Sequence, residues 1–248
     1  MRYDVATANI RINNISLEQV QFAKFLGVYI DEHLSWHKHI QVTSSKISKT
    51  NGILNKLHRF LPTFIILQLY NSLMLPYLTY CNCVWGTGSE NKFKSLIICQ
   101  KRAVRYIAKV SAKTHSLPYF KKYSIVKLDD LHKYLVQQLM YKHSHNLLPA
   151  PFVNYFNLSH NIHYYNTRHS SNYFIHFART NVRKNTIKFI GPKLWNALSN
   201  DLKESHSIFC FRKKLKNITF KIIRHSTLLP FLFSFLPPSS LPSFLFLS

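Results

Sequence analysis

The order of apolar and polar residues predicts helices along most of this chain. In the first long stretch, 35–61, an apolar residue recurs every seven positions, at Ile40, Ile47 and Leu54, with lysine and arginine between them. This spacing is typical of an amphipathic helix that buries one stripe and exposes its other faces. We expect Pro62 to end the helix, because proline has no backbone N–H with which to continue the hydrogen-bond ladder.

Further helices follow from the same spacing and from capping and breaking residues. Thr63 can cap the second helix, and Pro76 should stop it. Gly191-Pro192 suits the first turn of a later helix, where proline is tolerated. The other expected helices span 64–75, 91–109, 128–147 and 207–224. The chain is therefore expected to be mainly α.

The N-terminal residues depart from this helical pattern. Short apolar runs occur at 9–12, 15–20 and 24–30, and Asn13-Asn14 suits a turn between the first two. They predict a small antiparallel β unit in which 24–30 forms one short buried strand.

The C-terminal half is less regular. Residues 152–190 are aromatic and rich in asparagine, so we expect loops there, with one or two short strands near Tyr173–Phe177. Residues 228–248 are apolar and uncharged, which suggests a membrane helix, but four prolines interrupt the run. Because a lipid-exposed span must keep its backbone hydrogen bonds, we expect a poorly ordered tail instead.

These features divide the chain into four expected parts. They are a β unit at 1–32, a basic three-helix bundle at 33–110, a second irregular α-rich region at 111–225 and the apolar tail at 226–248.

The charge of the chain indicates which partners it could bind. The chain of 248 residues has 33 lysines and arginines against nine acids, a formal charge of +24. No acid occurs from His33 to Ser89, and none from Leu131 to Asn200. Such a surface repels itself unless a polyanion covers it, so the first expected partner is nucleic acid and the second an anionic membrane.

One stretch carries a family resemblance. Residues 24–31 read K-F-L-G-V-Y-I-D, and L-S-W-H-K-H-I follows at 34–40. This order resembles the segment just after the catalytic palm in reverse transcriptases of non-LTR (LINE-type, jockey-like) retrotransposons. Further matching positions extend to about residue 220, and they include Leu69–Leu73, Pro76, Tyr80, Trp85-Gly86, Tyr164-Tyr165, Thr167-Arg168, Gly191-Pro192, Leu194–Asn196, Leu202-Lys203, Ser207 and Phe211.

The resemblance implies a location and a role. Residues 33–110 would form a thumb-like bundle that grips template RNA or a primer–template duplex, and 111–225 would be the helical region after the polymerase. Fingers and palm would precede Met1, so the chain is expected to be a truncated remnant. Phe25, Leu26 and Val28 should then be less covered than in an ordinary strand, since the sheet they would extend is missing.

The chain departs from the family at the catalytic acids. Polymerases of this family hold two metal ions on palm aspartates, one from an aromatic-x-Asp-Asp turn. The adjacent acid pairs here are Asp31-Glu32 and Asp129-Asp130, and neither has that context. We read both pairs as residues at helix starts, where negative charge is favourable. No polymerase activity is expected.

The expected interface is sequence-independent binding to the RNA or DNA backbone, without a small-molecule substrate. Tyr106 and Tyr119 could stack on bases or pack in the core. The alternatives are a cationic peripheral membrane or protein-interaction protein that uses 207–224 and the tail, or an open reading frame with no biological role. The residues expected to contact phosphates are Lys46, Lys49, Lys56, Arg59, Lys101, Arg102 and Arg105.

Other side chains suggest little further chemistry. His33, His37 and His39 lack a second ligand pair at zinc spacing, and Cys81 and Cys83 are separated by one residue where structural zinc sites have two to four. We therefore expect no metal and no cofactor. Four irregularly spaced cysteines fit an intracellular, reducing compartment. Residues 212–216, R-K-K-L-K, fit either a nuclear localisation signal or a solvated helix face.

Overall fold

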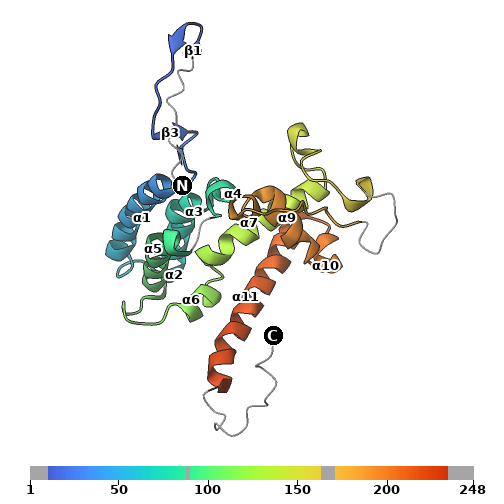
Figure 1. Ribbon diagram of the computed structural model, residues 1–248. Helices are drawn as coiled ribbons and strands as arrows, with labels where there is room; N and C mark the ends of the chain where they lie inside the picture. The colour runs from blue at the N-terminus through green and yellow to red at the C-terminus, as the bar shows by residue number, and fades with distance from the viewer. Residues whose placement is uncertain (1–10, 88–89, 163–170, 234–248) are drawn as a thin grey trace.

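The computed structural model describes residues 11–87, 90–162 and 171–233, and it is mainly helical with a small N-terminal β unit, as the sequence predicts. In Figure 1 the β unit projects from one end of the helical body. Tyr164-Tyr165 and Thr167-Arg168, which carry part of the resemblance, lie outside the described residues.

The β unit consists of two separate hairpins. In the first, β1 (Arg11–Ile12) pairs antiparallel with β2 (Ile15–Ser16). Asn13 and Asn14 both have positive φ, at 49° and 65°. Positive φ at both central positions is the pattern of a type I′ turn, which asparagine tolerates. The first predicted turn is confirmed.

The second hairpin corrects the prediction of one strand over 24–30. β3 (Phe22–Phe25) pairs antiparallel with β4 (Val28–Asp31), so the segment folds back on itself. Leu26 and Gly27 form the turn, with φ of 46° and 84°, and glycine adopts the second value without steric cost.

The expected poor coverage of this hairpin holds for two residues and is wrong for the third. Phe25 and Leu26 are 64% and 72% exposed, whereas Val28 is 6% exposed and belongs to the main core cluster. Tyr80 fixes the turn from the helical side, because its hydroxyl donates to the carbonyl of Leu26 at 2.6 Å.

Asp31 shapes the turn between the second hairpin and the first helix. Its carboxylate accepts hydrogen bonds from the backbone N–H groups of His33, Ser35 and Trp36, at 3.2, 2.8 and 2.8 Å, and from the Ser35 hydroxyl at 3.1 Å. Burial opposes ionisation of Asp31, but the hydrogen bonds favour the charged form and together lower its pKa.

The first long helix is α1 (His37–Leu57). Ile40, Ile47 and Leu54 are all buried, which confirms the seven-residue stripe. The helix ends at Leu57, and a short turn separates it from Pro62, so proline does not itself end the helix.

A single helical run follows, made of α2 (Thr63–Leu69), the π-helical turn η1 (Tyr70–Met74) and α3 (Leu75–Thr79). The predicted cap at Thr63 is wrong, because Pro62 holds the cap position and Thr63 is already helical.

Pro76 does not stop this run, contrary to prediction. It lies in the first turn of α3, directly after η1, where the N–H of Leu75 donates to the carbonyl of Tyr70. The wider π turn changes the hydrogen-bond register ahead of the proline, and a π turn of this kind can absorb a residue that an α-helix would reject.

The helix α5 (Glu90–Ala108) completes the bundle by packing along α1. Its Gln100 is 1% exposed and joins three elements through its amide. The Gln100 Nε2 donates to the Tyr70 hydroxyl and to the Val126 carbonyl, both at 3.0 Å, and Oε1 accepts from the Leu128 N–H at 2.9 Å. This network ties α5 to η1 and to the start of α7 (Leu128–Ser144).

A second core cluster joins α7 (Leu128–Ser144), α9 (Ile187–Asn196) and α11 (Ile208–Phe233). Tyr141 stacks on Phe211 with 4.6 Å between ring centroids, and its hydroxyl donates to the Ser205 carbonyl at 2.6 Å. The main cluster continues beyond residue 110, for instance at Phe120. The boundary expected between a bundle at 33–110 and a second region at 111–225 stays a prediction.

Shorter elements fill the connections. They are α4 (Asn82–Trp85), α6 (Leu117–Lys122), the 3₁₀ turns η2 (Ala150–Phe152) and η3 (Ser159–Asn161), α8 (Asn181–Lys184) and α10 (Asn200–Lys203). The strand expected near Tyr173–Phe177 is reduced to one isolated bridge between Leu158 and Tyr173.

Two C-terminal helices have other limits than predicted. α9 begins at Ile187, so Pro192 lies inside the helix and not in its first turn. α11 runs past the expected end at 224 to Phe233, and the tail residues 234–248 lie outside the described part of the chain.

Asp31→Ala is expected to lower the free energy of unfolding by about 1–2 kcal/mol near neutral pH, because the four hydrogen bonds that its carboxylate accepts in this turn are lost. Because the folded pKa lies below the ordinary 3.8, the stabilisation is present above 3.8 and is lost as pH falls through the folded pKa. Urea unfolding at neutral and strongly acidic pH should show the difference narrowing in acid. Asp31→Asn, which keeps one acceptor, should be intermediate, and a difference independent of pH would contradict the assignment.

Gln100→Leu is expected to lower the free energy of unfolding by roughly 2–4 kcal/mol, because it leaves the buried Leu128 N–H and Val126 carbonyl without their partner. Denaturant unfolding provides the measurement. Gln41→Leu on the exposed face of α1 is the matched control and should change stability by less than about 0.5 kcal/mol. Equal effects of the two variants would contradict a structural role for the Gln100 network.

Candidate nucleic-acid interface

The cations expected on α1 project from its solvent side. Lys46, Lys49 and Lys56 are exposed, and Arg59 is exposed in the turn after the helix. Lys49 and Lys56 are seven residues apart and therefore share a face of the helix. The buried stripe at Ile47 and Leu54 fixes this orientation, so the packing of α1 determines where its charges point.

The cations expected on α5 divide into two kinds. Lys101 and Arg102 are exposed. Arg105 is half-buried, and its Nε donates to the Thr114 carbonyl at 2.7 Å, so this side chain holds the turn after α5. One of its five N–H donors is thus in use, and the others can still meet an anion.

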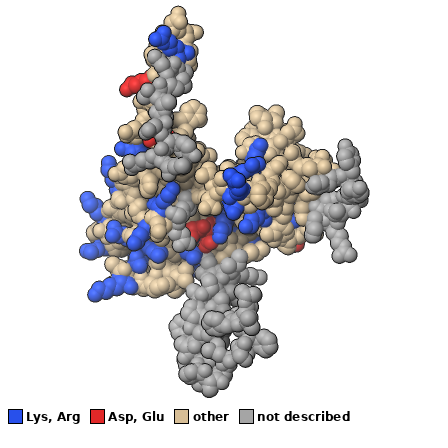
Figure 2. Space-filling model, viewed as in Figure 1, with Lys and Arg blue, Asp and Glu red and all other residues tan. Residues whose placement is uncertain are grey.

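The packing of α1 on α5 places the two basic faces at the same end of the molecule. The Asn51 amide on α1 donates to the Cys99 carbonyl on α5 at 3.0 Å, and both residues are buried. Figure 2 shows lysine and arginine side chains gathered over this end, where α1 and α5 lie. We call the exposed surface formed by Lys49, Lys56, Arg59, Lys101 and Arg102 the α1–α5 basic face.

Lys46 points elsewhere. Its Nζ lies 5.5 Å from the centre of the Tyr77 ring on α3, a cation–π distance. It also lines a hollow of about 370 Å³ between α1, α3 and the Leu26-Gly27 turn. Lys46 therefore faces the hairpin side of the bundle and stands apart from the α1–α5 basic face.

His39 on the same side of α1 is buried against Trp85, with 5.2 Å between ring centroids. Burial lowers its pKa, and the charge of Lys46 lowers it further. His39 is therefore neutral at physiological pH and adds no positive charge to this surface. Neither ring nitrogen has a hydrogen-bond partner within the described structure.

Of the two fates open to Tyr106 and Tyr119, stacking on bases or packing in the core, the structure shows the second. Tyr106 and Tyr119 are partly buried and pack against the main core cluster. Exposed rings occur instead on either side of Pro62: Phe60, in the turn after α1, is 82% exposed, and Phe64, in the first turn of α2, is 61% exposed. The signal in the sequence for Phe60 is its position between Arg59 and Pro62, because loop residues near a proline usually lie on the surface.

The prediction that both acid pairs begin helices is confirmed for Asp129-Asp130 and wrong for Asp31-Glu32, which ends β4 and enters the turn before α1. Asp31 caps the turn before α1, and Asp129 and Asp130 lie in the first turn of α7. Asp130 pairs with Lys127 at 3.8 Å, which is a weak, half-exposed ion pair. Helix stability therefore accounts for the pair on α7, and hydrogen bonding of the turn accounts for Asp31.

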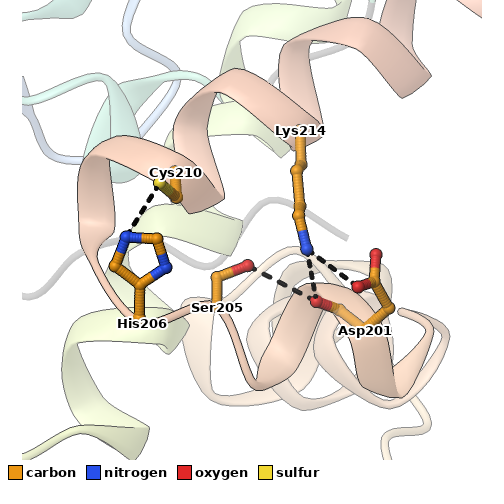
Figure 3. A network of polar contacts seen from close by, with 5 residues as sticks. All are labelled: Asp201, Ser205, His206, Cys210 and Lys214. Atoms are coloured by element: carbon orange, nitrogen blue, oxygen red, sulfur yellow. Dashed lines mark hydrogen bonds and ion pairs between the residues drawn. The ribbon is translucent and has the colours of Figure 1, made fainter.

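Near the start of α11, a lysine and a cysteine make polar contacts that could suggest further chemistry (Figure 3). The Lys214 Nζ donates to Oδ1 of Asp201 at 2.8 Å and to the Asp201 carbonyl at 3.1 Å. Cys210 Sγ lies 3.2 Å from Nε2 of His206, one helical turn away. Within the described structure no carboxylate orients His206, so this pair lacks the third member of a nucleophilic triad.

Across the described ranges, no group of three or more histidine, cysteine, aspartate or glutamate side chains is arranged to hold a metal ion. Over the same residues every helix is too short or too polar to cross a bilayer. Comparison of the chain with protein-family models, curated proteins and solved structures finds no match.

Proposed function

We propose that this chain binds RNA or DNA through its phosphates, using the α1–α5 basic face, and that it catalyses no reaction itself. Its role would be that of the thumb-like part of a LINE-type reverse transcriptase remnant. The observation that carries the proposal is the gathering of exposed cations on two packed helices, α1 and α5. The chain around the first of these helices has no acid from His33 to Thr87.

The electrostatics of this face favour a polyanion. Five exposed cations on Lys49, Lys56, Arg59, Lys101 and Arg102 repel one another in the absence of counter-charge. Neutralising them with phosphates releases condensed counterions from the nucleic acid, which supplies most of the binding free energy in non-specific complexes.

The same geometry favours sequence-independent binding. Lysine and arginine on the outer sides of two helices can contact phosphate oxygens, and such contacts position a nucleic acid without reading its bases. The exposed rings of Phe60 and Phe64 can add stacking, which every base can provide.

The acids support a non-catalytic role. Nucleotidyl transfer by two metal ions requires carboxylates that converge on the entering and leaving oxygens. Asp31 uses its carboxylate to cap a turn, and the pair on α7 begins a helix. Asp31, Asp129 and Asp130 thus have local structural roles, in a turn and at the start of a helix.

The membrane alternative requires α11 to lay an apolar face on lipid. Phe211, Leu215 and Phe220 of that helix are instead buried in the two core clusters. The protein would have to unpack them to present this face, so the nucleic-acid proposal is preferred.

The combined variant Lys49→Glu/Lys56→Glu is expected to weaken binding to single-stranded RNA and to reduce its salt dependence. The plot of log K against log salt should lose about 0.7 in slope for each phosphate contact removed. Fluorescence anisotropy with a labelled RNA, repeated across salt concentrations, measures both quantities.

The matched control is Lys184→Glu/Lys193→Glu, which changes the net charge equally through exposed residues of α8 and α9. It should leave the slope unchanged. Binding of the parent protein that does not vary between low and physiological salt would contradict the proposal, and so would equal losses in the two double variants.

Phe60→Ala is expected to weaken binding to single-stranded RNA by about 1–3 kcal/mol if its 82% exposed ring stacks on a base. Affinity for duplex RNA should not change, because paired bases present no open face. Phe209→Ala, a 72% exposed ring on α11, is the control and should have no effect on either ligand. Equal weakening of single-stranded and duplex binding would argue against stacking.

A further inference from the structure

A groove of about 420 Å³ lies between the bundle, α7 and α11. Tyr70 and Asn71 line it from η1, Tyr123 from the turn after α6, and Tyr134 from α7. Arg212 and Lys216 line it from α11. It is thus walled by elements that belong to both core clusters, and it lies apart from the residues of the α1–α5 basic face.

The two cations stand four residues apart on α11, and residues at this spacing share a helix face. The Nε of Arg212 donates to Oε1 of Gln138 at 2.7 Å, which fixes the guanidinium on this side of the helix. The guanidinium also influences the ring of Tyr134, since burial raises the pKa of Tyr134 and the charge of Arg212 opposes that rise.

Lys216 is half-buried but has no carboxylate partner among the described residues. Burial lowers the pKa of its amine. Among the described residues, no carboxylate pairs with Lys216 or with Arg212, whereas their neighbour Lys214 is paired with Asp201 (Figure 3). A charge withdrawn from water without a counter-charge costs free energy, and an anion in the groove would recover that cost.

The remaining lining provides a place for a ring. Tyr123 and Tyr134 are half-buried, and Tyr70 is buried with its hydroxyl already hydrogen-bonded to Gln100. The π turn η1 supplies another part of the lining, and π turns often occur at functional sites. The volume exceeds what a phosphate group alone would fill, and it falls in the range of small-molecule sites.

We propose that this groove binds an organic phosphate of nucleotide size, with the phosphate on Arg212 and Lys216 and its ring against Tyr123 and Tyr134. Arginine and lysine are the side chains that proteins use to bind phosphate, arginine by its fork and lysine as a point charge. The ligand is a free nucleotide or the terminal nucleotide of a strand, since both present the same chemistry.

This site is independent of the α1–α5 basic face. α11 contributes Phe211 and Leu215 to the second core cluster and Phe220 to the main one, so the groove spans the junction of the two. A ligand bound there should also raise the melting temperature, because it stabilises only the state in which both clusters are packed.

The test is isothermal titration of the full chain at physiological salt with uridine monophosphate, uridine and inorganic phosphate. Uridine monophosphate should bind, and each of the two partial ligands should bind at least about tenfold more weakly, the loss expected for one charge-assisted hydrogen bond or one stacked ring. A short oligouridylate with and without a terminal phosphate, titrated into Lys49→Glu/Lys56→Glu to weaken binding at the α1–α5 basic face, identifies the source. Binding that is tighter than the mononucleotide's and requires the terminal phosphate indicates a strand end, and binding equal to the mononucleotide's indicates a free nucleotide.

Lys216→Met keeps the aliphatic stem, removes a half-buried charge and should weaken uridine monophosphate binding by about tenfold. Lys213→Met on the same helix is the control, because Lys213 is exposed and does not line the groove. It should leave the affinity unchanged. Equal binding of uridine and its monophosphate, equal effects of the two variants, or no binding of the monophosphate would overturn the proposal.

A separate arm distinguishes this site from the nucleic-acid interface. Lys49→Glu/Lys56→Glu should leave uridine monophosphate binding intact, and Lys216→Met should leave the salt dependence of RNA binding intact. Loss of uridine monophosphate binding in the double variant would place the phosphate site on the α1–α5 basic face and overturn the groove assignment.

Discussion

The packing of α1 on α5 is the constraint on which the rest of the structure depends. Ile47 and Leu54 are fully buried along α1, and Leu96, Val104 and Ile107 are fully buried along α5. Each such side chain contributes about 1.5–3 kcal/mol when removed from water. Because a helix has one orientation when its apolar stripe is buried, the same contact that stabilises the bundle turns Lys49, Lys56, Lys101 and Arg102 outward. The position of the charge is therefore a consequence of the core.

Buried polar groups give this apolar contact its register. The amide of Asn51 fixes α1 along α5 through the Cys99 carbonyl, and the amide of Gln100 fixes α5 against Tyr70, Val126 and Leu128. Apolar contacts tolerate small sliding motions, whereas an unmade hydrogen bond in the interior costs about 1–3 kcal/mol. Gln100 also explains why the main cluster extends past the third helix of the bundle: the start of α7 is held by a side chain that belongs to α5.

The sequence predicts the features that repeat along the chain and misses those set by single residues. Apolar residues that repeat every seven positions can all be buried together only if the segment forms a helix, so α1 and its buried residues could be predicted. Gly27 reverses the chain within an apolar run, and no periodicity in eight residues reveals it. Proline predicts a helix limit at Pro76 and at Pro192, yet Pro76 follows a π turn inside a continuous helical run, and Pro192 lies within α9, where Gly191 permits close approach to Met140. Tertiary packing determines whether a helix continues through a proline, and the spacing of residues along the sequence does not reveal that packing.

The same distinction applies to charge. The sequence identifies which residues are cationic and which helix faces they occupy. The role of each cation, however, depends on the groups that surround it in the fold. Arg105 supports a turn, Lys46 lies over a ring, and Lys214 pairs with Asp201. Exposed lysines on α1 remain hydrated and attract any polyanion, which favours binding without selectivity. Lys216 is partly desolvated and lines the groove together with tyrosines. An anion that fits the groove would therefore interact with this charge more strongly than in water, and the shape of the groove would select among anions. One basic chain can thus combine an unselective surface with a selective groove, because burial and net charge act independently.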